Sequence, residues 1–145
     1  MRQYHWIAAT LMLALIILVP SAAAYERAKH FDDYSIYYNA MPSTRLAPDM
    51  AEQYELQRSR VRGVLMITVL HDGDPVPARV TARALDPRDR LQTVRMRQHE
   101  REEGISHLGL FRMEDGERLR FEVRVRPQDH DEEYTVEFSE RLFSD

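Results

Sequence analysis

Residues 118–126 have the sequence Arg-Leu-Arg-Phe-Glu-Val-Arg-Val-Arg. Apolar side chains occupy every second position of this stretch, and charged side chains occupy the positions between them. Because successive side chains of a β-strand point to opposite faces, this alternation predicts a strand with one buried face and one solvated face. A helix would instead spread these apolar residues around its axis. The stretch therefore places the domain in the β class.

Six further segments are predicted to be strands. Residues 134–139 and 76–82 alternate in the same way, and Pro77 in the second segment indicates an edge position or a slightly later start. Residues 63–70 are apolar at nearly every position, which is typical of a central strand covered on both faces. We expect three more strands at residues 34–40, 91–98 and 105–111.

Turn-forming residues separate these segments about every ten residues. The turns fall at residues 72–75, 86–89, 103–104 and 114–116. Short strands at this spacing predict a mostly β fold, an immunoglobulin-like antiparallel β-sandwich of about seven strands. One short helix is expected from Pro48, because proline suits the first helical position and Asp49 places negative charge in the first turn. Residues 25–33 are polar, and we expect them to be loosely ordered.

The first 24 residues have the pattern of a secretory signal peptide. Arg2 precedes an apolar run at residues 7–19, and small residues at Ala22 and Ala24 follow a proline. At about 1.5 Å per residue the run spans about 20 Å, whereas a membrane core needs about 30 Å. We expect cleavage between Ala24 and Tyr25, which leaves a single domain at residues 25–145 with no stable membrane span. An uncleaved inner-membrane anchor is the alternative.

The composition narrows the class of protein further. The chain has no cysteine, which excludes a lipid-modified amino terminus and disulfide staples. Its 24 acidic residues outnumber its 20 basic ones, which argues against nucleic acid as a partner because phosphate binding needs a basic surface. With the leader, these features predict a periplasmic protein that depends on its hydrophobic core for stability.

The segment at residues 34–51 carries a resemblance to a known family. Its sequence is Tyr-Ser-Ile-Tyr-Tyr-Asn-Ala-Met-Pro-Ser-Thr-Arg-Leu-Ala-Pro-Asp-Met-Ala, and it is followed by Tyr54 and by Arg58-Ser59-Arg60 ahead of an apolar strand. This pattern resembles the small exported proteobacterial proteins known as domain of unknown function 4426. The resemblance implies an exported, single-domain, immunoglobulin-like β protein of a Gram-negative bacterium. It supplies no catalytic residues.

Motifs for catalysis or metal binding are weak. His71-Asp72-Gly73-Asp74 offers an imidazole and two carboxylates, but it lacks the alternating acids and distant glutamate of an EF-hand, so a tight turn is favoured over a weak metal site. His99 and Glu100 lack the second histidine of a zinc-protease helix. The serines lack a glycine-flanked elbow. We therefore expect no catalytic residues and no cofactor.

Two segments are candidates for partner contact. Tyr38, Asn39, Ser43 and Thr44 could form an exposed patch, although alternate tyrosines of such a strand are more often buried. Arg58 and Arg60 could bind an anionic partner, although ion pairs with a neighbouring strand are the simpler interpretation.

These observations predict a non-catalytic binding or accessory module for another envelope protein. The alternatives are a binder of anionic envelope polymer or lipid head groups, and a small periplasmic hydrolase. The sequence does not indicate the oligomeric state.

Overall fold

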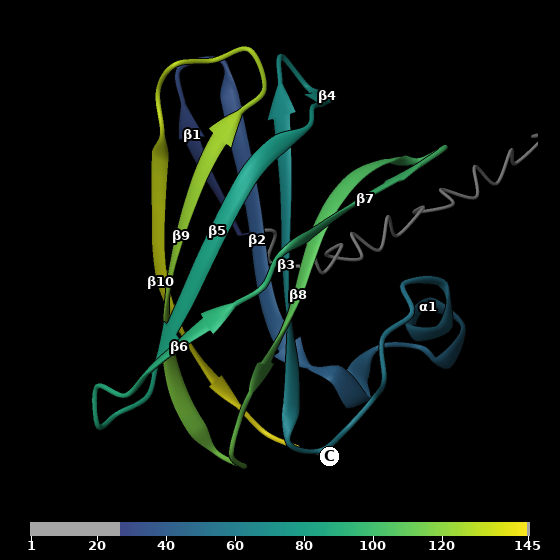
Figure 1. The fold of residues 1–145 in the computed structure, drawn as a ribbon, viewed down its shortest axis with the longest axis vertical. Coiled ribbons are helices and arrows are strands. Elements are labelled where there is room, and N and C mark those ends of the chain that lie inside the picture. The colour runs from purple at the N-terminus through teal and green to yellow at the C-terminus, as the bar shows by residue number, and fades with distance from the viewer. Residues whose placement is uncertain (1–26, 145) are drawn as a thin grey trace, which may run out of the picture.

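The computed structural model describes residues 27–144, which form two antiparallel β-sheets packed face to face (Figure 1). This is the immunoglobulin-like sandwich expected from the alternating pattern. The predicted signal peptide, residues 1–24, and its cleavage residues Ala22, Ala24 and Tyr25 lie outside the described residues. Within residues 27–144, no helix has the length and apolar composition needed to cross a membrane.

The first sheet, sheet A, has six strands. Its main order is β1 (Ala28–Phe31), β2 (Tyr34–Pro42), β3 (Arg62–His71), β8 (Gly104–Arg112) and β7 (Arg97–Arg101), and the two-residue strand β4 (Asp74–Pro75) also pairs with β3. The second sheet, sheet B, has the order β10 (Tyr134–Leu142), β9 (Glu117–Pro127), β5 (Ala78–Leu85) and β6 (Leu91–Val94).

The core lies between the sheets, and β9 shows how the sequence builds it. Leu119, Phe121, Val123 and Val125 have no exposed surface, whereas the charged residues between them face outward. Phe121 lies at the centre, with its ring 4.9 Å from that of Phe111 in sheet A. The alternation that predicted this strand is therefore confirmed side chain by side chain.

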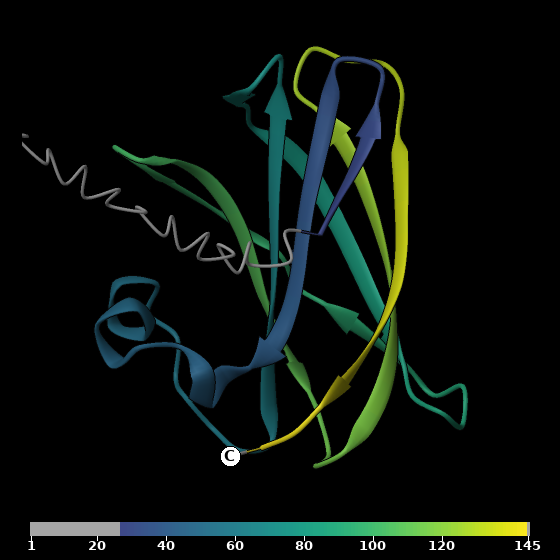
Figure 2. The same ribbon diagram turned by 180° about the vertical axis from the view of Figure 1, so that it is seen from behind.

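Strand β3 is buried on both faces, as its apolar run predicted. Leu65, Ile67 and Val69 point into the sandwich. Val64 points the other way, into a second cluster beneath the connection between β2 and β3. That connection contains a 3-10 helix, η1 (Ser43–Arg45), and the predicted short helix, α1 (Pro48–Gln53), which lie beside sheet A (Figure 2).

Two expectations were wrong in detail. Residues 91–98 are not one strand: β6 pairs in sheet B, β7 pairs in sheet A, and the chain crosses between the sheets at Arg95 and Met96. The polar segment before β2 is not loosely ordered, since Ala28–Phe31 pairs with β2 as an edge strand. Backbone pairing with a neighbour, which a local pattern does not contain, decided both cases.

Turns and strand starts follow the local sequence more closely. Strand β5 begins at Ala78, after Pro77, because proline has no N–H to give to the sheet. Asp72 and Gly73 both have positive φ and join β3 to β4 in the expected tight turn. The β1–β2 and β3–β4 turns lie at one end of the sandwich, and the β5–β6 loop and β8–β9 turn lie at the other (Figure 1).

Candidate functional site

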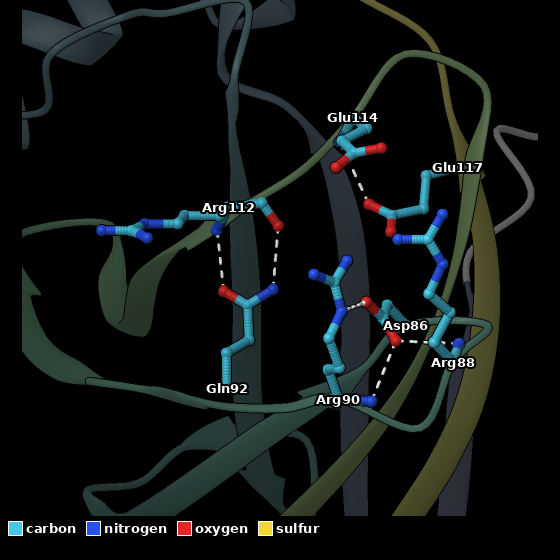
Figure 3. A network of polar contacts seen from close by, with 7 residues as sticks. All are labelled: Asp86, Arg88, Arg90, Gln92, Arg112, Glu114 and Glu117. Atoms are coloured by element: carbon cyan, nitrogen blue, oxygen red, sulfur yellow. Dashed lines mark hydrogen bonds and ion pairs between the residues drawn. The ribbon is translucent and has the colours of Figure 1, made fainter.

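A cleft of about 550 Å³ lies at the end of the sandwich that holds the β5–β6 loop and the β8–β9 turn. Its walls come from both sheets: the start of β3, the end of β8, the β5–β6 loop, the start of β6 and the β8–β9 turn. The lining residues are Val61, Arg62, Asp86, Arg90, Leu91, Gln92, Arg112, Met113, Glu114 and Glu117. Figure 3 shows the polar contacts that shape this site.

Asp86 organises the β5–β6 loop. Its carboxylate accepts hydrogen bonds from the backbone N–H groups of Arg88 and Arg90, each at 2.9 Å, and from Nε of Arg90 at 2.5 Å (Figure 3). Asp89 has a φ of 58°, a conformation that aspartate tolerates in turns. Burial by itself would raise the pKa of Asp86, but these hydrogen bonds together lower it below its ordinary value. The carboxylate is therefore ionised and committed to holding the loop.

Gln92 joins the two sheets across the cleft. Its amide nitrogen donates to the carbonyl of Arg112 at 2.9 Å, and its amide oxygen accepts from the N–H of Arg112 at 2.8 Å (Figure 3). The side chain thereby takes the place of a neighbouring strand for β8, because β7 pairs with β8 only as far as Leu108. On the far wall, the carboxylate of Glu117 accepts from the backbone N–H of Glu114 at 3.0 Å and fixes the β8–β9 turn.

The rim of the cleft combines apolar side chains with the guanidinium groups of two arginines. Val61 is 62% exposed and Leu91 is 56% exposed, the two most exposed large hydrophobic residues among those described. The guanidinium groups of Arg62 and Arg112 have no partner within residues 27–144. The cleft can therefore receive a ligand that presents both an apolar group and a carboxylate.

A second cluster lies at the opposite end of the sandwich. Nε2 of His71 donates to Oδ2 of Asp33 at 2.6 Å and lies 3.6 Å from Oδ2 of Asp72. The three potential ligand atoms all lie within 4.8 Å of one another. The ring of Tyr34 stacks on the His71 ring at 4.4 Å and fixes its orientation. The hydrogen bond from His71 lowers the pKa of Asp33.

Sequence comparison assigns the family. The profile of "Domain of unknown function (DUF4426)" matches residues 28–145. The chain belongs to the DUF4426 family. The resemblance carried by residues 34–51 is thus confirmed. The comparison with curated proteins returned no match.

Solved structures agree with this assignment. A DUF4426 family protein from Pseudomonas aeruginosa is 29% identical, with a TM-score of 0.74 over 83% of this chain and 96% of that one. FetP from uropathogenic Escherichia coli, in its as-isolated form, has a TM-score of 0.60 over 81% of this chain and 93% of that one. A copper-bound FetP variant has a TM-score of 0.59 over 80% and 93%. FetP is only 6% identical in both cases, so it shares the fold alone.

The predicted contact patch of this DUF4426 domain is only partly at the surface. Asn39 is exposed, but the Tyr38 ring packs 4.6 Å from that of Phe138 against the core. Ser43 has no exposed surface. Its hydroxyl donates to the carbonyl of Ser59 at 2.9 Å and accepts from the N–H of Ser59 at 2.8 Å. The prediction that Ser43 contacts a partner is therefore wrong, because it pins the segment before β3.

Thr44 is half-buried beside Ser43, and its hydroxyl has no hydrogen-bond partner in the described part of the chain. Arg58 donates to the Thr44 carbonyl at 2.6 Å, and Arg60 is exposed. Neither arginine forms an ion pair within residues 27–144, so the predicted ion pairs with a neighbouring strand are not found there. The two arginines remain a candidate anion contact.

The sequence indicated neither the cleft nor the position of Asp33. The cleft forms where β6 of sheet B lies beside β8 of sheet A. In the sequence, Leu91 appeared only as part of the predicted strand at residues 91–98. Asp33 is 38 residues from His71 in sequence. A weak signal existed, because Asp32 and Asp33 are turn residues immediately before a predicted strand. Since that strand pairs with β3, its turn must lie beside the His71 turn.

Proposed function

We propose that this DUF4426 protein is an exported, non-catalytic binding module of the bacterial cell envelope, and that the cleft receives a segment of another envelope protein. The leader pattern and the absence of cysteine support export without a lipid anchor. The proposal for the binding mode depends on the rim of the cleft.

The single observation that carries the proposal is the exposure of Val61 and Leu91 beside the guanidinium groups of Arg62 and Arg112, which have no partner within the described residues. Burial of exposed apolar surface drives most protein association, and arginine pairs with carboxylates through two hydrogen bonds. A volume of about 550 Å³ falls within the range of sites that hold a compact ligand or a few side chains. A peptide segment with an apolar side chain next to an acidic one fits this chemistry.

Two of the three acidic residues that line the cleft, Asp86 and Glu117, favour binding over hydrolysis. A general acid or base works best when its pKa lies near the operating pH. Asp86 is instead held ionised by three hydrogen bonds, and one carboxylate oxygen of Glu117 is used by the backbone of its own turn. Both carboxylates therefore maintain the shape of the site.

A pull-down from native envelope extract tests the proposal. The bait is the full chain, either wild type or Leu91→Asp, which places a charge in the mouth of the cleft. We expect the wild-type protein to recover one envelope protein in near-stoichiometric yield, and Leu91→Asp to recover at least about tenfold less. The matched control is Met50→Asp, the same change at an exposed apolar residue of α1, and it should bind normally.

Circular dichroism melting of the three proteins confirms that each is folded. An equal loss of the partner in Leu91→Asp and Met50→Asp, or full retention in both, would contradict docking at the cleft.

A further inference from the structure

The outer surface of sheet B is lined with arginine. Charged side chains of β9 alternate with its core residues, so they all face solvent, and the neighbouring strands add more. We call this surface the arginine face. Its exposed members are Arg79 and Arg83 on β5, Arg118, Arg120, Arg124 and Arg126 on β9, and Arg141 on β10.

Strand register places some of these arginines directly opposite one another. Arg79 pairs with Arg126 across β5 and β9, and Arg118 pairs with Arg141 across β9 and β10. Side chains directly opposite in an antiparallel pair lie about 5 Å apart, where like charges are destabilising. The guanidinium groups of Arg79 and Arg118 have no acceptor within residues 27–144. The fold thus keeps two like-charge pairs that do not stabilise it.

Acidic residues beside this face compensate only part of its charge. Glu122 lies 2.6 Å from Arg83 and 3.1 Å from Arg124, and the hydrogen bond from Arg83 lowers its pKa. Glu137 lies directly opposite Glu122 on β10. Asp89 adds a third carboxylate, with its Oδ1 3.6 Å from Arg120. Three carboxylates thus face seven guanidinium groups, although the whole chain has a net charge of −4. Positive charge is therefore concentrated on one face of an acidic protein.

We propose that the arginine face binds an anionic phospholipid surface. Guanidinium groups bind phosphate oxygens through paired hydrogen bonds, and basic residues near a membrane are attracted to its anionic head groups. The arginines extend across three adjacent strands, so they form a two-dimensional array that matches a planar surface better than a single polymer chain. A hollow on this face between β5, β6 and β9 measures about 190 Å³, which is smaller than typical small-molecule pockets.

This inference does not depend on the proposed protein partner. The cleft uses Val61, Arg62 and Arg112 at the end of the sandwich, and none of these belongs to the arginine face. Variants of the face leave the cleft residues unchanged, so loss of lipid binding and loss of the protein partner can be measured separately.

Vesicle co-sedimentation tests the inference with the full chain. The vesicles contain either phosphatidylglycerol mixed with phosphatidylcholine, or phosphatidylcholine alone. We expect binding to the anionic vesicles in excess of any binding to the neutral ones, and we expect this excess to disappear as salt rises from about 0.05 M to about 0.5 M. All variants have the same leader, so differences between them report on the folded domain.

The decisive variant is Arg79→Gln with Arg118→Gln. Each basic residue near an anionic membrane strengthens binding about fivefold, so this variant should bind the anionic vesicles at least about tenfold more weakly. Its melting temperature should not fall, because neither side chain has an acceptor in the described residues. The matched control is Lys29→Gln with Arg97→Gln, two exposed basic residues on strands of sheet A and outside the face, which should bind nearly as well as wild type.

Three outcomes would overturn the inference. They are no preference of the wild-type protein for anionic vesicles, equal loss of binding in the two double variants, and binding to a soluble acidic polysaccharide with none to anionic vesicles. The last outcome would assign the face to a polymer instead.

Discussion

Gly109 is a position where replacement of one hydrogen atom by a methyl group should damage the fold. It lies on β8, beneath the segment that crosses from sheet B to sheet A between β6 and β7. A Cβ atom at Gly109 would lie 2.6 Å from Sδ of Met96, 2.7 Å from Cγ1 of Val94 and 2.9 Å from the carbonyl oxygen of Arg95. We predict that Gly109→Ala destabilises the domain through this overlap.

The magnitude follows from which atoms can move. The Met96 side chain is flexible and can shift away. Val94 is buried and β-branched, and the Arg95 carbonyl is part of the crossing backbone, so both resist displacement. Overpacking of this kind costs about 2–3 kcal/mol. For a domain of this size, that corresponds to a decrease in melting temperature of about 10 °C.

Thermal unfolding followed by circular dichroism measures the effect, with urea titration as an independent check on the free energy of unfolding. Gly73→Ala is the matched control, because a Cβ at Gly73 would meet nothing within 4 Å and only its φ of 86° is unfavourable. That strain costs about 1 kcal/mol. Adding Val94→Ala to Gly109→Ala should give a total loss smaller than the sum of the two single losses. A Gly109→Ala variant that melts no lower than Gly73→Ala would refute the reasoning.

Two further predictions concern single polar contacts. Ser43→Ala should lower the free energy of unfolding by about 1–3 kcal/mol in urea titration, because it removes both hydrogen bonds to the Ser59 backbone. Ser43→Thr keeps the hydroxyl and should lose less stability. Equal losses in the two variants would contradict this role of the hydroxyl. The hydrogen bond from His71 lowers the pKa of Asp33 below 3.8, so it stabilises the fold above that pH and is lost as pH falls through the folded-state pKa. Wild type should therefore exceed Asp33→Asn in stability at pH 6, by a margin that shrinks below about pH 4, and a margin independent of pH would contradict the assignment.

The strands of this domain could be predicted because their information is local. The apolar positions of β9 alternate without a break, and each one proved to be buried. The residues from Pro48 began a short helix as expected, since proline favours that position whatever surrounds it. The segment at residues 91–98 was predicted as one strand because alternation records only which side chains face inward. It does not record which sheet supplies the hydrogen bonds.

Unlike the strands, the two candidate sites depend on contacts between residues far apart in the sequence. His71 and Asp72 were recognised as possible ligands, but Asp33 joins them only because β2 pairs with β3. The cleft exists because Gln92 of one sheet binds the backbone of Arg112 in the other, 20 residues away. Ser43 was predicted to lie at the surface, but it is buried, and its hydroxyl is hydrogen-bonded to the backbone of Ser59.

The sequence by itself determined the β class and the inward and outward faces of the strands, because side-chain alternation and turn chemistry act over a few residues. The family follows from the match of residues 28–145 to its profile. The strand order, the crossing over Gly109, the cleft and the arginine face were decided only by the tertiary structure. Each of them depends on pairing or packing between segments far apart in the chain, and a local pattern contains no record of which distant segment becomes the neighbour.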